Sequence, residues 1–414
     1  MRKLSLVDII LSHVASNVLE MDKKSFAKRI AEVKNYPLDA LIVRANRIED
    51  AGDRAMAFQA IAVLEQAING YVHSPILMDW CSSGASLISV ICRDLTGMKS
   101  CGVFNEYNQD PGNLYQLTAD LVNTLSGSNY LRKQVKKAML SYYYGGQKKA
   151  KLTFGDDLQF FEQAYAQLLP CAYEFRKQTL NAWPSELNAI EFTLPDHYQV
   201  YVPIMLDSAS QRLDIVDEAE DITNGINMRF KVQGCRRKGA AHTLGLGAHL
   251  IHGCDGFIKR ELIVMSHLTR EMCLEILSRD SNMFLDSGNI VIPECIQGVL
   301  ESYKETGYLS YRVFALLKDY EGEFHLPVDL RIDLLNMAER LGDETFEMLH
   351  IHDEFGVLPQ YVNQLRKNAN TVYAGLYRSN LMEYYNRKFN MSVPVKPFDK
   401  NVYEQLLEVD YLLS

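Results

Sequence analysis

Residues 346–358 read FEMLHIHDEFGVL, two short apolar runs on either side of the polar triplet His352, Asp353 and Glu354. Short apolar runs that flank a polar turn predict an antiparallel hairpin, here with acidic residues at its tip. A separate run, ILM at 76–78, ends at Asp79 and predicts a short buried strand. We therefore expect a small sheet whose strands end in acidic side chains that face a cleft.

Helical periodicity dominates the remainder of the chain. It covers 4–65, 131–144 and 156–181, continues to about 341 after a strand-like stretch at 190–235, and returns in the tail at 363–414. The pattern predicts an α+β fold with an antiparallel sheet and mostly helical surroundings. We expect five units, at 1–75, 76–101, 102–260, 261–345 and 346–414. The exposed face of residues 3–20 is expected to contact either a partner chain or the rest of this chain.

Composition bounds the class of protein. The chain has 414 residues, of which 43 are basic and 52 acidic, giving a net charge of −9. A hydrophobic content of 47% suffices for sizeable cores and excludes disordered and fibrous classes, while the negative charge means that any anion site must be local. The eight cysteines form no C-x-x-C pair, which favours a reducing cytosol. We find neither a signal peptide nor a run of about 20 apolar residues, so no membrane partner is expected.

A local concentration of positive charge begins at Arg132. Residues 132–151 contain seven basic side chains and no acid. Arg132 and Lys136 are four residues apart, so they lie on one stripe of the predicted helix. Arginine offers a bidentate fork and lysine a mobile charge for phosphate oxygens, so the stripe predicts a polyphosphate site. An ordinary solvated basic face is the alternative.

Asp79 and Asp353 form a candidate metal pair, because each follows or ends an apolar strand. Two such carboxylates can share two Mg²⁺ ions, and a metal pair stabilises both the attacking and the leaving oxygen in phosphoryl displacement. Neither aspartate alone is a specific signal.

A second basic stretch lies between 228 and 241, after an acidic loop at 214–221. Its five basic residues without an acid suit phosphate contacts along a duplex, although a basic surface loop is the alternative. The five are Arg229, Lys231, Arg236, Arg237 and Lys238. The histidine pairs at 249/252 and 350/352 have spacings compatible with transition-metal ligands, but such spacings are common by chance.

Three motifs, in order along the chain, resemble motifs A, B and C of the phage-type single-subunit RNA polymerases, a family that includes the mitochondrial transcriptase. They are DWCSSG at 79–84, Arg132-x3-Lys136-x7-Tyr144-Gly145, and HDEFG at 352–356. Each motif alone is weak, but three with matching internal spacing are a strong signal. Weaker likeness covers about 25–258 and resumes from about 340 to residues 410–411.

The resemblance implies a right-hand polymerase core. The segments at 76–101 and 346–414 would form the palm, 102–260 the fingers with a promoter-hairpin-like segment, and 261–345 a helical insertion. Two Mg²⁺ ions would be held by Asp79 and Asp353, helped by the backbone carbonyl of Trp80. His352 would lie by the primer terminus, and Arg236 and Arg237 would belong to the promoter-reading hairpin.

The resemblance also implies a nucleotide site on the basic helix. Arg132 and Lys136 would bind the incoming triphosphate, and Tyr144 would sit against its sugar and the template base. Gly145 would allow the helix to end there, and Tyr115 would pack near Tyr144.

The residue at position 84 favours ribonucleotides. DNA polymerases of the A family share the motif B spacing and often have a glutamate where this chain has Glu354. They place a glutamate five residues after the motif A aspartate, where it blocks the ribose 2′-hydroxyl, whereas Gly84 has no side chain to do so. Leu140 stands where the DNA enzymes carry an aromatic residue, and Phe355-Gly356 has the RNA-enzyme form.

We therefore expect an enzyme that makes RNA from ribonucleoside triphosphates on a DNA template. Asp79 comes early compared with the family's enzymes, so we expect the catalytic subunit of a split, two-subunit phage RNA polymerase in the cytoplasm of an infected bacterium. A second subunit would supply the thumb and N-terminal functions, or a single-stranded-DNA-binding protein would load the enzyme. An A-family-like DNA polymerase and a non-catalytic nucleic-acid-binding module are the alternatives.

Two family features have no clear counterpart. The family's further phosphate-contacting lysine before motif A is not identified, and Arg44 or Arg47 are the substitutes that we considered. The family's histidine just after Asp255 is replaced by Phe257 or Ile258. The long segment between Asp255 and Asp353 has no assigned role.

Overall fold

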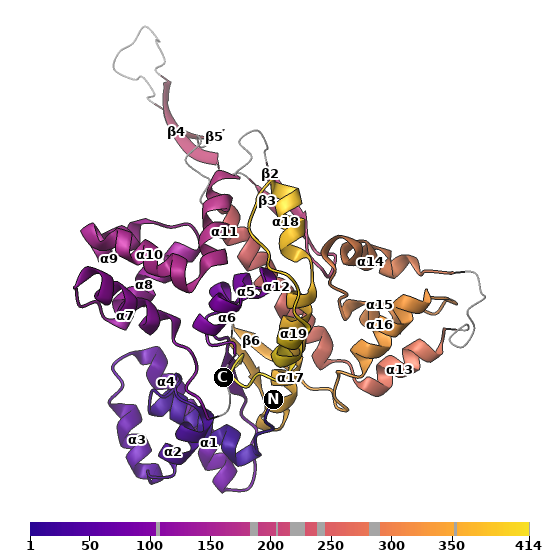
Figure 1. The fold of residues 1–414 in the computed structure, drawn as a ribbon, viewed down its shortest axis with the longest axis horizontal. Coiled ribbons are helices and arrows are strands. Elements are labelled where there is room, and N and C mark those ends of the chain that lie inside the picture. The colour runs from indigo at the N-terminus through magenta and orange to yellow at the C-terminus, as the bar shows by residue number, and fades with distance from the viewer. Residues whose placement is uncertain are drawn as a thin grey trace.

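The computed structural model describes residues 1–104, 108–182, 189–203, 206–215, 228–237, 245–280, 290–351 and 354–413. Helices predominate, and the three sheets are small and antiparallel, as the sequence predicted for an α+β fold (Figure 1). Helices surround one three-stranded central sheet. No helix in the described ranges combines the length and apolar character that a bilayer crossing requires.

The central sheet has the strand order β1-β7-β6. Strand β1 (Ile76–Asp79) pairs antiparallel with β7 (Glu354–Val357), and β7 pairs with β6 (Leu349–Ile351). Both the strand predicted before Asp79 and the two strands predicted on either side of residues 352–353 are confirmed. Two segments far apart in the sequence are thus joined by one ladder.

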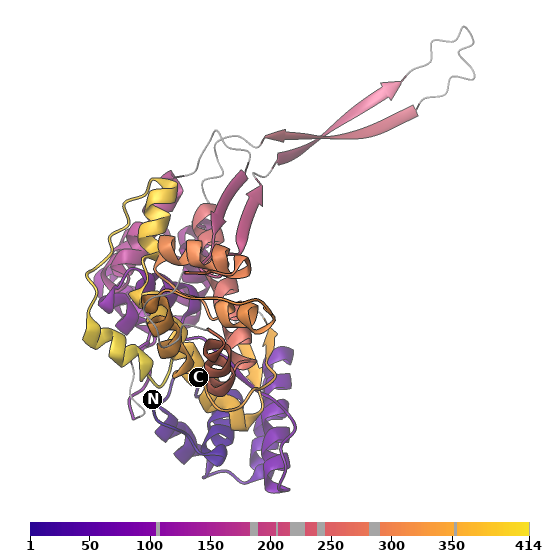
Figure 2. The same ribbon diagram turned by 90° about the vertical axis from the view of Figure 1, so that its right-hand side faces the viewer.

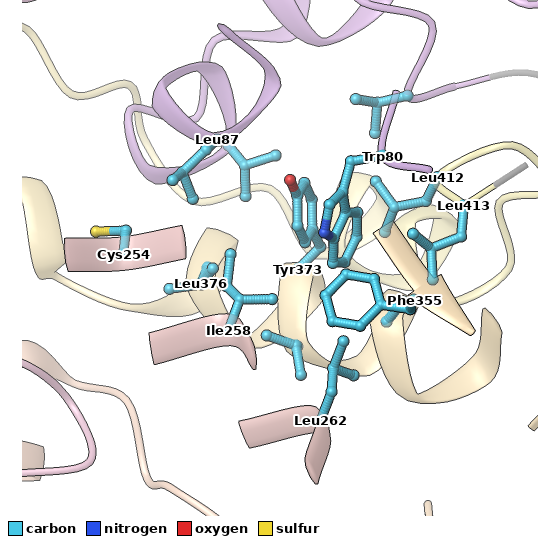
Figure 3. Close-up of a cluster of buried hydrophobic side chains, with 14 of the residues drawn as sticks. Trp80, Leu87, Cys254, Ile258, Leu262, Phe355, Tyr373, Leu376, Leu412 and Leu413 are labelled. Atoms are coloured by element: carbon cyan, nitrogen blue, oxygen red, sulfur yellow. The ribbon is translucent and has the colours of Figure 1, made fainter. Parts of the chain in front are cut away.

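An aromatic and aliphatic cluster supports this sheet (Figure 3). Trp80 stacks on Tyr373, with ring centroids 4.8 Å apart, and meets Phe355 edge-on at 5.6 Å. The cluster also takes side chains from α5 (Ser83–Ile91), α12 (Gly245–Ser266) and α17 (Val362–Arg378). Full burial of a side chain such as Phe355 contributes about 1.5–3 kcal/mol, so this cluster fixes the sheet against three helices.

Four helices precede the sheet: α1 (Leu6–Val18), α2 (Phe26–Val33), α3 (Leu38–Asn46) and α4 (Ala51–Ile68). The Ser5 hydroxyl caps α1 by accepting from the Asp8 N–H at 3.1 Å. Residues 9–15 and Val18 of α1 are buried against its neighbours, and a partner contact on the exposed face of residues 3–20 stays a prediction. Leu6 and Val7 remain 46% and 60% exposed.

The next layer contains α6 (Leu95–Ser100), α7 (Leu114–Ser126), α8 (Arg132–Tyr143), α9 (Lys148–Phe154), α10 (Leu158–Leu168) and α11 (Pro170–Asn181). The single helix expected at 156–181 is wrong, because the chain breaks between α10 and α11. Pro170 has no N–H to continue a helix, and Leu169 adopts φ −137° and ψ 61° before it. Pro170 instead begins α11.

Two antiparallel ribbons follow. Strand β2 (Ala189–Thr193) pairs with β3 (Gln199–Pro203), and β4 (Leu206–Ile215) pairs with β5 (Met228–Arg237). The β4–β5 ribbon projects from the body of the molecule as a long arm (Figure 2). The register places Arg212 opposite Lys231 and Asp214 opposite Arg229. The rest of the acidic loop and Lys238 lie outside the described residues.

The 261–345 segment forms α13 (Arg270–Ser278), α14 (Glu294–Thr306), α15 (Arg312–Lys318) and α16 (Val328–Ala338) on the side of the central sheet opposite α7–α10 (Figure 1). A buried acid in α12, Glu261, attaches this insertion. It accepts hydrogen bonds from the Ser310 hydroxyl at 2.6 Å, the Tyr311 N–H at 2.8 Å and the Tyr308 hydroxyl at 3.3 Å. Burial raises the pKa of Glu261 to about 7, although these hydrogen bonds oppose the shift.

The C-terminal segment contains α18 (Leu381–Phe389) and α19 (Lys400–Leu407) and then returns to the central sheet. The Cys81 N–H donates to the Leu412 carbonyl at 3.0 Å, and Trp80 forms a β-bridge with Leu413. The chain around Trp80 is therefore held from both sides, by β7 and by residues 412–413.

Candidate active site

Asp79 lies at the end of β1, where its side chain is exposed. Its register partner is Glu354, the first residue of β7. His352 and Asp353, the other acidic-motif residues expected here, lie outside the described residues. The ladder nevertheless brings Asp79 opposite the residue that follows Asp353 in the chain, at the close Cα spacing of an antiparallel pair.

Gly84 follows the strand that ends at Asp79 and lies beside the end of the basic helix α8. After β1 the chain turns through Ser82, which adopts left-handed φ 54° and ψ 52°, and Gly84 is buried in the first turn of α5. A Cβ atom on Gly84 would lie 3.2 Å from the Tyr144 hydroxyl oxygen and 3.5 Å from Ile251 Cγ2. The residue expected to admit a ribose therefore faces the tyrosine expected to contact that ribose.

Tyr144 stands where α8 ends. Gly145 follows with φ 91°, a left-handed conformation that suits glycine, and its N–H donates to the Tyr142 carbonyl at 3.1 Å. The Tyr144 ring meets His252 of α12 edge-on, with centroids 5.0 Å apart. His252 is an exposed residue, although partial desolvation of its ring lowers its pKa. Its sequence spacing suggested only a doubtful metal ligand, and the structure instead makes it a support for Tyr144.

A buried arginine holds the same helix end. Arg176 of α11 donates from Nε to the Tyr142 carbonyl at 3.2 Å, and its guanidinium lies 3.8 Å from the Tyr142 ring centroid. A cation at a helix C-terminus interacts favourably with the exposed carbonyls there. Arg176 therefore positions the turn that carries Tyr144, and nothing in its sequence surroundings indicated this.

Arg132 and Lys136 lie at the start of α8 and share one aromatic neighbour. The Arg132 guanidinium and the Lys136 ammonium lie 5.9 Å and 5.8 Å from the Tyr115 ring centroid. Arg132 also donates from Nε to Asn113 at 3.3 Å. Burial raises the pKa of Tyr115 well above its usual value, so it is a neutral phenol. Tyr115 thus lies close to both cations.

The loop between α1 and α2 also reaches this region. Lys23 forms an ion pair with Asp22 at 3.0 Å. Burial raises the pKa of Asp22, but the positive charges of Lys23, Arg132 and Arg29 outweigh it, so the pKa lies below its usual value. Asp22 and Asp79 line the same cavity of about 280 Å³. This loop therefore adds charged groups beside the site.

Buried Arg29 fixes that loop. It donates to the carbonyls of Lys24 at 2.8 Å and Asp22 at 2.6 Å. The substitutes considered earlier, Arg44 and Arg47, lie on or beside α3, where Arg44 binds the Val18 carbonyl. Lys23 pairs with Asp22, which lines the cavity with Asp79, and its charge opposes the burial that raises the pKa of the Cys81 thiol to about 11. The adjacent lysines at 23–24, just after the first helix, were the feature of the sequence that could have indicated a basic residue here.

The expected promoter-hairpin residues lie elsewhere. Arg236 and Arg237 are in β5, paired with Asp207 and Leu206 of β4, on the arm that projects away from the sheet (Figures 1 and 2). In the described part of the chain, no group of three or more His, Cys, Asp or Glu side chains forms a preassembled metal site. The structure places Gly84 beside Tyr144 and Tyr115 near Arg132 and Lys136, puts Asp79 and Trp80 shortly before Gly84 in the chain, and carries Arg236 and Arg237 on the separate β4–β5 arm.

No protein-family model matches this sequence, and no curated protein matches it either.

Proposed function

We propose that this chain is the catalytic subunit of a DNA-dependent RNA polymerase of the phage-type, single-subunit kind. The observation that carries the proposal is the contact between Gly84 and Tyr144. It joins the turn after Asp79 to the end of the helix that begins with Arg132. A carboxylate, a polyphosphate-binding pair and an open position beside a tyrosine are what ribonucleotide transfer requires in one place.

The donor set fits Mg²⁺. Asp79 offers an exposed carboxylate at a strand end, and the Trp80 carbonyl is a further oxygen donor, while Mg²⁺ prefers oxygen ligands. We propose Asp79, Trp80 and Asp353 as its ligands. Bound Mg²⁺ would supply activation of the 3′-hydroxyl and stabilisation of the leaving phosphate oxygen.

The remaining residues act by positioning and by charge. Arg132 and Lys136 neutralise the β- and γ-phosphates of the incoming nucleotide, and Tyr115 keeps the two cations apart and oriented. Tyr144 contacts the sugar, and Gly84 leaves room for its 2′-hydroxyl. We propose that the β4–β5 arm, with its basic β5 strand, contacts promoter DNA, and that a second protein supplies thumb and N-terminal functions.

The test is primer extension with the protein as co-purified from its native context, using a primed DNA template, Mg²⁺ and the four ribonucleotides. Asp353→Asn is expected to abolish extension while the circular dichroism spectrum and melting temperature stay unchanged. Asp319→Asn, which alters an exposed acid in the insertion, is the matched control and should extend normally.

Three results would contradict the proposal. Wild-type-like extension by Asp353→Asn would remove the metal-ligand role. A preference for deoxyribonucleotides would indicate an A-family-like DNA polymerase. Tight binding of primer–template without incorporation of either sugar would indicate a non-catalytic nucleic-acid-binding module.

A further inference from the structure

The seam between the insertion and the palm contains a cavity of about 90 Å³ that the proposed polymerase chemistry does not use. Its walls come from α14 and α16 on one side and from α17 and α19 on the other. Two arginines line it, Arg340 and Arg378, together with the tyrosines Tyr303 and Tyr403. Two cationic side chains in one small cavity favour the binding of an anion.

Arg340 is held in place at one side of the cavity. Its Nη2 donates to the Tyr403 hydroxyl oxygen at 2.9 Å, and its guanidinium lies 5.7 Å from the Tyr403 ring centroid. An arginine has five N–H donors, and this is the hydrogen bond that Arg340 makes within the described residues. Because Tyr403 accepts here, its own hydroxyl proton is available to a further acceptor.

Arg378 approaches from the palm side. It is the last residue of α17, and it lines the cavity with Thr371 and Gly375, which are seven and three residues earlier on the same helix face. Its side chain makes no hydrogen bond or ion pair with any other residue in the described ranges. Arg378 therefore has all its donors free to bind a ligand.

One acid, Asp333, also lines the cavity. Its Oδ2 already accepts from the Tyr303 hydroxyl at 2.9 Å, and neither arginine is within ion-pairing distance of it. The cavity thus holds two positive charges against one negative charge. Lys367, one turn before Thr371 on α17, is influenced by Arg340 and by three acids: burial is the main cause that lowers its pKa, Arg340 lowers it further, and Asp343, Glu408 and Glu339 oppose the shift.

We propose that this seam binds a single phosphate group through Arg340, Arg378 and the Tyr403 hydroxyl. At about 90 Å³ the cavity is several times larger than the roughly 10–15 Å³ that a single water needs, so it has room for one tetrahedral oxyanion. Arginine forks match phosphate oxygens in pairs, and a tyrosine hydroxyl can donate to a third. The phosphate is either a free anion or part of a polynucleotide. The site does not depend on the proposed polymerase activity.

The test measures binding of two probes to the full chain in a chloride buffer. Calorimetry follows inorganic phosphate, and fluorescence anisotropy follows a short single-stranded oligonucleotide. Arg340→Gln and Arg378→Gln are each expected to weaken binding by about ten-fold or more, because each removes a charged hydrogen-bond donor. Asp333→Asn should strengthen binding, since it removes the opposing charge and keeps an acceptor for Tyr303.

Arg270→Gln is the matched control. Arg270 is a half-exposed arginine of the same insertion that pairs with Glu339 at 2.7 Å and does not line the cavity. Its loss should leave binding unchanged. Binding of inorganic phosphate that follows this pattern identifies a free anion, and oligonucleotide binding alone that follows it identifies a polynucleotide phosphate. Failure of the wild type to bind either probe, or equal binding by all variants, overturns the proposal.

Discussion

The Gly84–Tyr144 site and the attachment of the insertion are both places where distant segments meet, but different forces hold them. At the site, a buried glycine beside Tyr144, the ring contact between Tyr144 and His252, and two cations near the Tyr115 ring hold the segments together. At the insertion, the buried carboxylate of Glu261 gathers three donors. The residues of the first are ones that the sequence motifs single out. The role of Glu261 in the second depends on its burial in the folded protein.

Gly84→Glu tests the role of the Gly84–Tyr144 site and should produce the largest loss of activity. The Cβ alone would lie 3.2 Å from the Tyr144 hydroxyl, so a carboxylate would displace Tyr144 and occupy the space for a 2′-hydroxyl. We expect kcat/KM for ribonucleotides to fall about 100-fold, a loss of roughly 2.7 kcal/mol of transition-state stabilisation.

Gly84→Ala is the control for that change. The Tyr144 hydroxyl is the far end of a side chain and can yield by a few tenths of an ångström, so we expect only a small loss. Equal loss of ribonucleotide and deoxyribonucleotide addition by Gly84→Glu would remove the selective role of Gly84.

Glu261→Gln tests the insertion side through the pH dependence of stability. The folded-state pKa is raised to about 7, above the unfolded value, so the folded state binds more protons between these two values. The free energy of unfolding should therefore fall as pH rises from about 4.5 to 7, by up to about 3 kcal/mol in a two-state unit.

In Glu261→Gln this slope should disappear, as measured by urea unfolding across that pH range. Glu339→Gln, which alters an exposed acid paired with Arg270, should keep the slope. An unchanged slope in Glu261→Gln would show that another group titrates.

Arg176→Met should loosen the end of α8. It removes a charged hydrogen bond to the Tyr142 carbonyl and a cation over the Tyr142 ring, so we expect a loss of about 2 kcal/mol in unfolding free energy. If Arg176 positions Tyr144, discrimination between ribose and deoxyribose should also fall, and Arg176→Lys should restore part of it. Lys177→Met, next to it and exposed, is the control. Lost stability with intact discrimination would limit Arg176 to packing.

Tyr115→Leu should have the smallest effect. Each cation over the ring contributes about 0.5–1 kcal/mol, so KM for the nucleotide should rise a few-fold with little change in kcat. Tyr115→Phe keeps the ring and should bind nucleotide normally. A large fall in kcat for Tyr115→Phe would mean that the hydroxyl, rather than the ring, matters.

Particular elements show what the sequence could predict. Strands β1, β6 and β7 were predicted closely, because short apolar runs with polar ends are a local pattern. The break between α10 and α11 was also local, at Pro170, but the helical periodicity on both sides concealed it. The motif spacing predicted that Gly84, Arg132 and Tyr144 would serve one site. The structure places Gly84 beside Tyr144, at the opposite end of α8 from Arg132, and the shared site stays a prediction.

The remaining features depend on tertiary contacts that no local pattern encodes. Lys23 reaches the site because Arg29 ties down its loop, and His252 meets Tyr144 because α12 crosses behind the sheet. In the sequence, Glu261 resembles any helical glutamate. Its burial, and the course of the four insertion helices, follow from packing across the whole molecule.

The pairing of β1 with β7 has a consequence for synthesis of the protein on the ribosome. At about 5–20 residues per second, tens of seconds pass between the appearance of Ile76 and that of Val357, its strand partner. During this time the apolar edge of β1 has no strand to pair with, and α1 and α4 are the elements already made that can shield it. Early translation products should therefore depend on those helices to avoid aggregation.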